Sequence, residues 1–173
     1  MSVFRIKSTA PILLAVLLLA SACSPGKGPP QTRVGFDKDV VQTVREKMGQ
    51  IQAPVTLQFY RGGPGEKNAE ETAALLDLIK NSSSQIEIKE HNLFRDSQLM
   101  GPLGIKHGPV IIPRGPNPID ISYYGYPARR ELEPFLDGVL IASGQIPRLS
   151  ASTETFLKEL DQDLLIRVFV TPD

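Results

Sequence analysis

The sequence predicts one α/β domain that follows an N-terminal export segment. The chain has 173 residues, enough for one domain with a full core but few for two. From Phe36 onward, stretches with helical periodicity alternate with stretches in which apolar residues occupy every second position. Hydrophobic residues make up 41% of the chain and charged residues 22%, as in ordinary globular proteins.

The first predicted elements are a helix and a strand. Apolar residues recur at three- and four-residue steps over residues 38–50, and Asp37 can serve as the N-cap of this helix. Residues 55–60 then alternate, with Val55, Leu57 and Phe59 on one face, which is typical of a strand.

A loop, a second helix and a second strand follow. Residues 61–67 are rich in Gly and Pro, Asn68 can cap a helix that extends to about Lys80, and Ile86 and Ile88 mark the next strand. A strand, helix and strand in this order favour a parallel pair with a right-handed crossover.

The second half adds a hairpin and further helices. Residues 96–103 are predicted to form a short helix, and residues 110–112 and 119–124 two strands of a hairpin. A helix over residues 127–143 is followed by a shorter one over residues 153–160. Residues 164–170 are apolar on both faces except for Arg167, as in a central strand.

The N-terminus carries the features of an export signal. Arg5 and Lys7 precede an apolar run, residues 11–20, that is shorter than the ~20 residues a membrane-spanning helix needs. Leu-Ala-Ser-Ala then precedes Cys23, which resembles the lipobox of bacterial lipoproteins, where this cysteine is diacylated. The alternative is an ordinary secretory signal that leaves Cys23 as a free thiol. Ser24 after the cysteine resembles the pattern of lipoproteins sorted to the outer membrane.

These features divide the chain into four parts. Residues 1–22 are the expected signal peptide, and residues 23–35 the lipidated cysteine and a flexible tether. Residues 36–150 form the main domain, and residues 151–173 add a helix and a strand. We expect the protein on the periplasmic side of a membrane, held by the lipid anchor.

Three segments of the main domain resemble one family. Residues 55–59, the Gly-Pro-Val-Ile sequence at 108–111 and the Tyr-Tyr-Gly-Tyr-Pro-Ala sequence at 123–128 resemble the glutaredoxin-like units of protein disulfide oxidoreductases. They are also similar to the N-terminal domain of the flavoprotein component of alkyl hydroperoxide reductase. The resemblance implies a thioredoxin-like fold: a central mixed sheet flanked by helices, here with an extra N-terminal helix and a C-terminal helix plus strand.

The catalytic motif of that family is degenerate in this chain. The family carries Cys-Pro-x-Cys after the first strand, where a helix N-terminus lowers the pKa of the first thiol. The matching positions are Gly63, Pro64, Gly65 and Glu66, so neither sulfur is present and no catalytic residue is expected. Pro109 matches the family's cis-proline, and the groove beside it is expected to remain able to bind an extended peptide.

The same region offers candidates for other ligands. Arg61, Lys67 and Gly108 flank the loop and are candidates for binding an anion or a peptide, although a plain structural turn is the simpler interpretation. His91 and His107 lie apart in sequence, so no metal site and no cofactor are expected. Tyr123, Tyr124 and Tyr126 are expected to pack rather than to bind a ligand. A net charge of zero gives no reason to expect nucleic acid as a partner.

The leading functional expectation is therefore a periplasmic lipoprotein with a redox-inactive domain that binds a protein or peptide, or supports a redox unit.

Residues 168–172 resemble the strand that opens the second unit of two-unit oxidoreductases, just before its first cysteine. An alternative follows, in which a UGA codon after Asp173 encodes selenocysteine and a catalytic second unit continues; a truncating mutation and a naturally short product are the competing accounts. A ligand-binding lipoprotein is the third class. Residues 164–170 also suggest a homodimer through this terminal strand.

Overall fold

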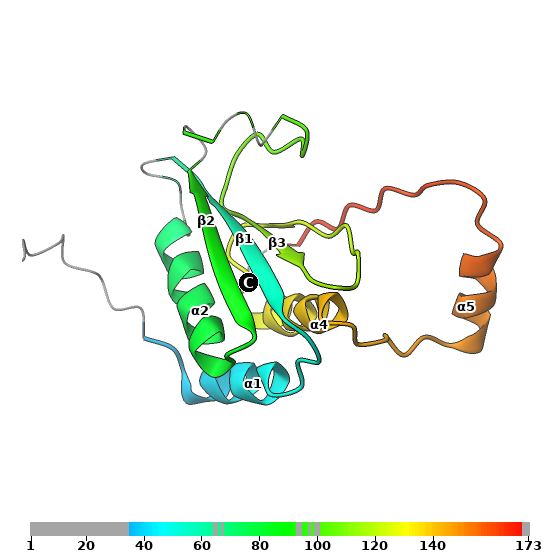
Figure 1. Cartoon of the computed structure of the whole chain (residues 1–173), viewed down its shortest axis with the longest axis horizontal. Helices are drawn as coiled ribbons and strands as arrows, with labels where there is room; N and C mark the ends of the chain where they lie inside the picture. Colours follow the sequence, from blue (N-terminus) through cyan, green and yellow to red (C-terminus); the bar gives the residue numbers. More distant parts are fainter. Residues whose placement is uncertain are drawn as a thin grey trace, which may run out of the picture. The chain divides into compact units, whose positions relative to one another are not determined.

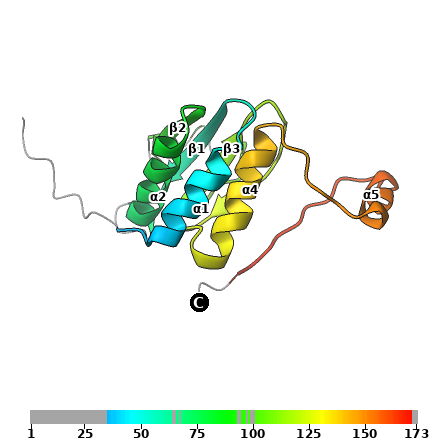
Figure 2. The same ribbon diagram turned by 90° about the horizontal axis from the view of Figure 1, so that it is seen from below.

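The computed structural model describes residues 35–63, 66, 68–92, 95–96, 98 and 101–170. The described part contains a four-stranded sheet with the strand order β2-β1-β3-β4. Its helices are α1, α2, α4 and α5, and a short 3₁₀ turn, η1, precedes α4. Figure 1 shows α1 and α2 near β1 and β2, and Figure 2 shows α2, α1 and α4 side by side over the sheet.

The first strand pair confirms the predicted parallel pairing. β1 (Val55–Arg61) pairs in parallel with β2 (Ile86–Asn92), and α2 (Ala69–Ser82) connects them. The helix begins after Asn68, whose backbone carbonyl accepts hydrogen bonds from both the amide and the hydroxyl of Thr72. Asn68 occupies the N-cap position, but its side chain makes no capping bond.

The second half of the sheet is antiparallel. β3 (Val110–Arg114) lies against β1 on one side and against β4 (Tyr123–Tyr124) on the other, so the predicted hairpin is present. β4 is shorter than the expected strand over residues 119–124. The Arg114 guanidinium donates a hydrogen bond to the Ile119 carbonyl, and the prolines of the connection lack the amide that a ladder requires.

The main core lies between the helices and one face of the sheet. α1 (Lys38–Met48) packs against α2 and α4 (Leu132–Ala142). The expected helix over residues 127–143 starts with η1 (Arg129–Glu131) and becomes α-helical at Leu132. The buried residues of this core include Val44, Met48, Val55, Leu57, Phe59, Leu75, Leu76, Ile79, Ile111, Phe135, Leu136, Val139 and Leu140.

A smaller cluster lies on the other face of the sheet. It contains Tyr60, Ile105, Val110 and Ile112. Because side chains alternate along a strand, Phe59 and Tyr60 belong to opposite faces, and so do Ile111 and Ile112. Near its C-terminal end, β1 is therefore buried on both faces, by Phe59 on one and Tyr60 on the other.

The C-terminal part differs from the expected helix and strand. α5 (Ala151–Lys158) starts two residues earlier than predicted, because the Ser150 hydroxyl caps the helix by accepting from the amide of Thr153 at 3.2 Å. Residues 164–170 are not part of a sheet in the structure, and their side chains are exposed. A strand needs a neighbour for its backbone groups, and no strand among the described residues pairs with this segment.

Candidate functional site

The candidate site lies where β1 ends and α2 begins. Gly62 and Gly63 follow the strand, and Glu66 lies just before the N-cap of the helix. Three of the residues that the sequence singled out here, Pro64, Gly65 and Lys67, lie outside the described residues, as does Cys23. Gly63 and Glu66, the positions that match the two cysteines of the family motif, are both described.

The structure brings Glu66 to the segment that carries Pro109. The Gly108–Pro109 peptide bond is cis, at the position where the resemblance places a cis-proline. The amide of Gly108 donates a hydrogen bond to Oε1 of Glu66 at 3.0 Å, across a sequence separation of 42 residues. A bond between an amide and a carboxylate is stronger than one between neutral groups, so this contact joins the loop to the start of β3.

Two glycines make room for this contact. A Cβ atom on Gly62 would overlap the Glu66 carboxylate. A Cβ atom on Gly108 would lie 2.7 Å from both the amide nitrogen of Gly62 and the carbonyl oxygen of Tyr60. The backbone of the cis-proline turn therefore packs directly on the end of β1, and only glycine fits at these two positions without a shift.

The second carboxylate oxygen of Glu66 has a different environment. Oε2 is buried, and it has no hydrogen-bond partner among the described residues. A buried carboxylate oxygen without a donor is costly, because it has lost its bonds to water. Oε2 is therefore the group at this site that is best placed to accept a hydrogen bond from a bound donor.

Arg61, an expected anion-binding residue, is engaged with two carboxylates. Its guanidinium forms ion pairs with Glu70 at the start of α2 and with Glu90 on β2, the latter at 3.3 Å. The hydrogen bond with Glu70 is the main cause that raises the pKa of Arg61, partly opposed by burial. These two ion pairs already use much of the positive charge with which Arg61 could bind an anion.

A cavity of about 370 Å³ opens beside these residues. The described residues that line it are Arg61, Gly62, Gly63, Glu66, Ala69, Glu70 and Asn92. Among the described lining residues, two carboxylates and one guanidinium that is already paired leave an excess of negative charge. It is thus suited to a hydrogen-bond donor or a cation more than to an anion.

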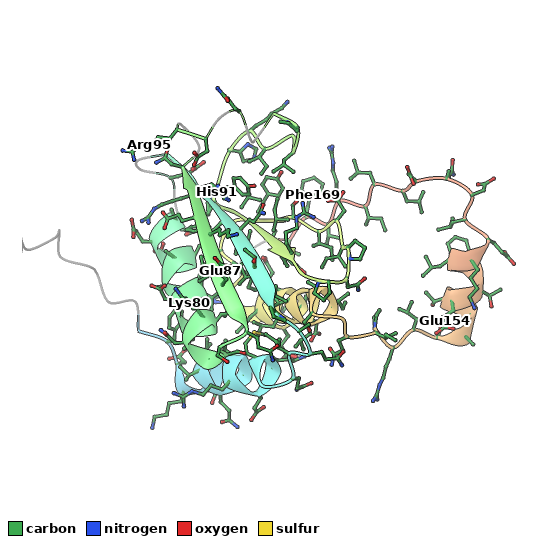
Figure 3. The ribbon with its side chains drawn as sticks, viewed as in Figure 1. Lys80, Glu87, His91, Arg95, Glu154 and Phe169 are labelled. Atoms are coloured by element: carbon green, nitrogen blue, oxygen red, sulfur yellow. The ribbon has the colours of Figure 1, made fainter. Side chains whose placement is uncertain are left out.

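The histidines do not meet. His91, on β2, stacks on Tyr60 with ring centroids 4.7 Å apart, and its Nε2 is buried without a partner among the described residues (Figure 3). Burial raises the pKa of the Tyr60 phenol, whose hydroxyl donates to Gln58 at 2.9 Å. His107 lies near Tyr124 instead, with ring centroids 5.8 Å apart. Within the described residues, no group of three metal-ligating side chains comes together.

The three tyrosines have separate surroundings. Tyr123 packs edge-on against Phe135 and donates a hydrogen bond to the carbonyl of Pro134 on α4. Tyr126 is partly buried against the main core, whereas Tyr124 is exposed. Tyr123 and Tyr126 therefore pack as expected, whereas the exposed Tyr124 does not.

The bond between Glu66 and Gly108 was not predicted from the sequence. The family motif marks Glu66 only as a residue that replaces a cysteine, and the two positions are distant in sequence. The signal that could have revealed the bond is the glycine content of both segments, since close backbone approach requires glycine. The stacking of His91 on Tyr60 was also missed, because it depends on the register between β1 and β2.

Comparisons with known proteins identify the fold. The protein disulfide oxidoreductase from Aeropyrum pernix K1 has a TM-score of 0.60 at 19% identity, over 73% of this chain and 56% of that one. A cysteine-to-alanine mutant of the alkylhydroperoxide reductase AhpF from Enterococcus faecalis has a TM-score of 0.60 at 16% identity, over 72% and 61%. The NTD_N/C domain of the same reductase has a TM-score of 0.59 at 15% identity, over 70% and 59%.

No protein-family model and no curated protein matches the sequence. The chain spans little more than half the length of the solved structures that it resembles. The described helices include none that is both long and apolar enough to cross a membrane. The order of the elements, the mixed sheet and these structural neighbours together show that the chain has a thioredoxin-like fold of the kind found in protein disulfide oxidoreductases.

Proposed function

We propose that this protein is a periplasmic lipoprotein, anchored through Cys23, whose thioredoxin-like domain binds an extended peptide of a partner protein and does not exchange disulfides. One observation carries the proposal. Glu66 stands where the family motif has its second cysteine, and its carboxylate accepts a hydrogen bond from the Gly108 amide. The pocket that holds sulfur in related enzymes is thus built around a carboxylate.

The chemistry of thiol exchange requires a thiolate that attacks a disulfide. Cys23 is the chain's single cysteine, and the proposed anchor uses its sulfur in a thioether. A carboxylate is no substitute nucleophile for this reaction. The fold without its sulfurs keeps the geometry that presents a backbone next to the cis-proline, which supports binding.

The site favours a ligand with a hydrogen-bond donor. Oε2 of Glu66 is buried without a partner among the described residues, and Glu66 lines the cavity together with Glu70. A lysine or arginine side chain of a peptide would supply donors and positive charge at that oxygen. An anion is less favoured, because Arg61 already pairs with Glu70 and Glu90.

The absence of thiol chemistry can be tested by restoring the motif. We expect the unmodified chain to show no dithiothreitol-dependent reduction of insulin, and the double variant Gly63→Cys/Glu66→Cys to acquire it, since the helix N-terminus lowers the pKa of a thiol there. Gly63→Ser/Glu66→Ser is the matched control without sulfur. Turnover by the unmodified chain would contradict the proposal.

Binding can be tested with a defined probe. We expect a blocked penta-alanine peptide with one central lysine to shift the amide resonances of Gly62 and Gly108, and the same peptide with a central glutamate to shift neither. Glu66→Ala should abolish the response to the lysine peptide, whereas Glu87→Ala, on β2, should keep it. An equal response to both peptides would argue against recognition by Glu66.

A further inference from the structure

One oxygen of the Glu66 carboxylate is already in use. Oε1 accepts a hydrogen bond from the Gly108 amide at 3.0 Å, so this backbone donor sets the direction in which the carboxylate faces. Oε2 takes the position away from that bond, where it is buried and has no hydrogen-bond partner among the described residues. A ligand therefore meets one unpaired carboxylate oxygen rather than two.

The backbone of Gly62 lies against the unpaired oxygen. A Cβ atom at Gly62 would overlap both Oε2 and the carboxylate carbon of Glu66, so the loop encloses this oxygen closely. A donor that reaches Oε2 has to part the lining of the cavity. The donor group with the smallest head needs the smallest shift of that lining.

The charges around the cavity favour a cationic donor. Glu66 and Glu70 line the cavity together with Arg61, whose guanidinium is paired with Glu70 and with Glu90 on β2. These described side chains provide three carboxylates and one guanidinium. The N-terminus of α2 adds about half a positive charge, which is too little to balance the difference.

Lysine and arginine present different donors to such an oxygen. The guanidinium of arginine is planar, and it pairs best with a carboxylate through two parallel hydrogen bonds, one to each oxygen. Because Oε1 of Glu66 is bonded to Gly108, one of these two acceptors is already engaged. The ammonium of lysine is compact, holds its charge on one nitrogen and needs only one oxygen for a short hydrogen bond.

We propose that the site selects a lysine side chain of the bound peptide over an arginine side chain, and that the Gly108 amide sets this selectivity by orienting the Glu66 carboxylate. The inference rests on the proposed peptide-binding function and narrows its ligand to a primary ammonium. Gly108 is a positioning residue here, because it acts on the ligand through Glu66.

The Gly108 amide should also orient a glutamine at position 66. In Glu66→Gln the amide still needs an acceptor, so the side-chain carbonyl oxygen takes the place of Oε1. The side-chain NH₂ group then lies where Oε2 lies in the unmodified protein. The site thereby changes from one that accepts a hydrogen bond to one that donates it.

Titrations with matched peptides test the selectivity on the full chain. Blocked penta-alanine peptides with a central lysine or a central arginine have the same charge, and the amide resonances of Gly62 and Gly108 report their binding. We expect the lysine peptide to bind about tenfold more tightly, which is the value of one hydrogen bond to a charged group. Glu87→Gln removes an exposed carboxylate of β2 and is the matched control, which should keep this preference.

The failure of this inference and that of the proposed function give different results. Equal affinity for the lysine and arginine peptides would overturn the selectivity and leave the proposed peptide binding in place. If neither peptide binds, the proposed function fails and this inference fails with it. A penta-alanine with a free N-terminus that binds as tightly as the lysine peptide would assign the ammonium to a peptide end and overturn the selection of a side chain.

The Glu66→Gln variant tests the orientation. A third blocked peptide carries a central glutamate γ-methyl ester, whose side chain is neutral and can only accept hydrogen bonds. We expect the unmodified protein not to bind this peptide, and Glu66→Gln to bind it and to lose the lysine peptide. The Gly108 amide resonance should keep its downfield position in Glu66→Gln and lose it in Glu66→Ala.

Three results would refute the role of Gly108. The first is a Glu66→Gln chain that still prefers lysine, and the second is one that keeps the Gly108 hydrogen bond but does not bind the ester peptide. The third is loss of the Gly108 hydrogen bond in Glu66→Gln, because the amide then does not orient the side chain.

Discussion

At the scale of single residues, Glu66 decides what the site can do. Its carboxylate joins the loop after β1 to the cis-proline turn through the Gly108 amide, and Gly62 leaves the space it needs. One substitution relative to the family motif therefore removes a thiol and adds a hydrogen bond. The site is organised around this bond, which gives Glu66 a structural role in addition to its proposed binding role.

Removing this bond should lower stability measurably. We expect Glu66→Ala to reduce the free energy of unfolding by about 1–2 kcal/mol, because the Gly108 amide loses its acceptor. Glu66→Gln should cost less, since an amide oxygen can still accept. Urea unfolding measures both, with the exposed Glu87→Ala as control. If Glu66→Ala lowers the free energy of unfolding no more than Glu87→Ala does, the bond to Gly108 does not stabilise the fold.

One buried and two partly buried tyrosines predict a loss of stability at high pH. Burial is the main cause that raises the pKa of Tyr123, with Asp137 adding to it, and the pKa of Tyr60 and Tyr126 is also raised. The folded state thus keeps these protons to a higher pH than the unfolded state. Their contribution is complete below the unfolded pKa of about 10 and is lost as pH rises through the folded pKa.

Tyr123→Phe tests this dependence. The free energy of unfolding, measured by urea between about pH 8 and pH 11, should fall less steeply with pH in this variant, because one raised phenol is gone. Tyr124→Phe, at an exposed position, controls for the loss of a surface phenol. If the free energy of unfolding of Tyr123→Phe falls with pH as steeply as that of the unmodified protein, the burial of Tyr123 does not contribute to the pH dependence.

At the scale of elements, the sequence predicted what depends on local pattern. The alternation in β1 and the helical spacing in α1 and α2 place their apolar residues on one side, and the structure buries them there. The short β4 and the approach of Glu66 to Gly108 could not be predicted in the same way. The first depends on competing hydrogen bonds of the loop, and the second on a contact between distant segments.

The packing of β4 on α4 provides a test at this scale. A Cβ atom on Gly138 would overlap the hydroxyl of Tyr123, so the glycine makes room for the tyrosine. Alanine gains about 1 kcal/mol of helix propensity over glycine, but the displaced ring would leave Pro134 and Phe135. We expect Gly138→Ala to destabilise the protein by about 1–2 kcal/mol, as overpacking does.

In the Tyr123→Phe background the same change should cost less, because the overlapping hydroxyl is absent. The nearest remaining ring atom would be 3.2 Å from the new Cβ, a tight contact that a small shift relieves. A double-mutant cycle by urea unfolding should give a coupling of about 1 kcal/mol. Equal costs of Gly138→Ala in both backgrounds would show that the two residues do not interact in this way.

At the scale of the whole molecule, the folded domain and the remainder of the chain have different requirements. The main core is closed by α1, α2 and α4, and it buries its large apolar side chains. The C-terminal part exposes its own. Its strand-like composition could be recognised in the sequence, but the structure pairs it with no described strand.

The proposed anchor gives a prediction for the complete protein. Two or more acyl chains at Cys23, each methylene contributing about 0.8 kcal/mol, make attachment effectively permanent, whereas one chain would not. We expect the protein to pellet with membranes and to incorporate labelled palmitate, and Cys23→Ser to lose the label. Since the described helices include none that could span a bilayer, the variant should retain no membrane attachment through them. Ser24→Ala, one residue further, is the matched control and should stay labelled; a Cys23→Ser chain that still carries palmitate would rule out this anchor.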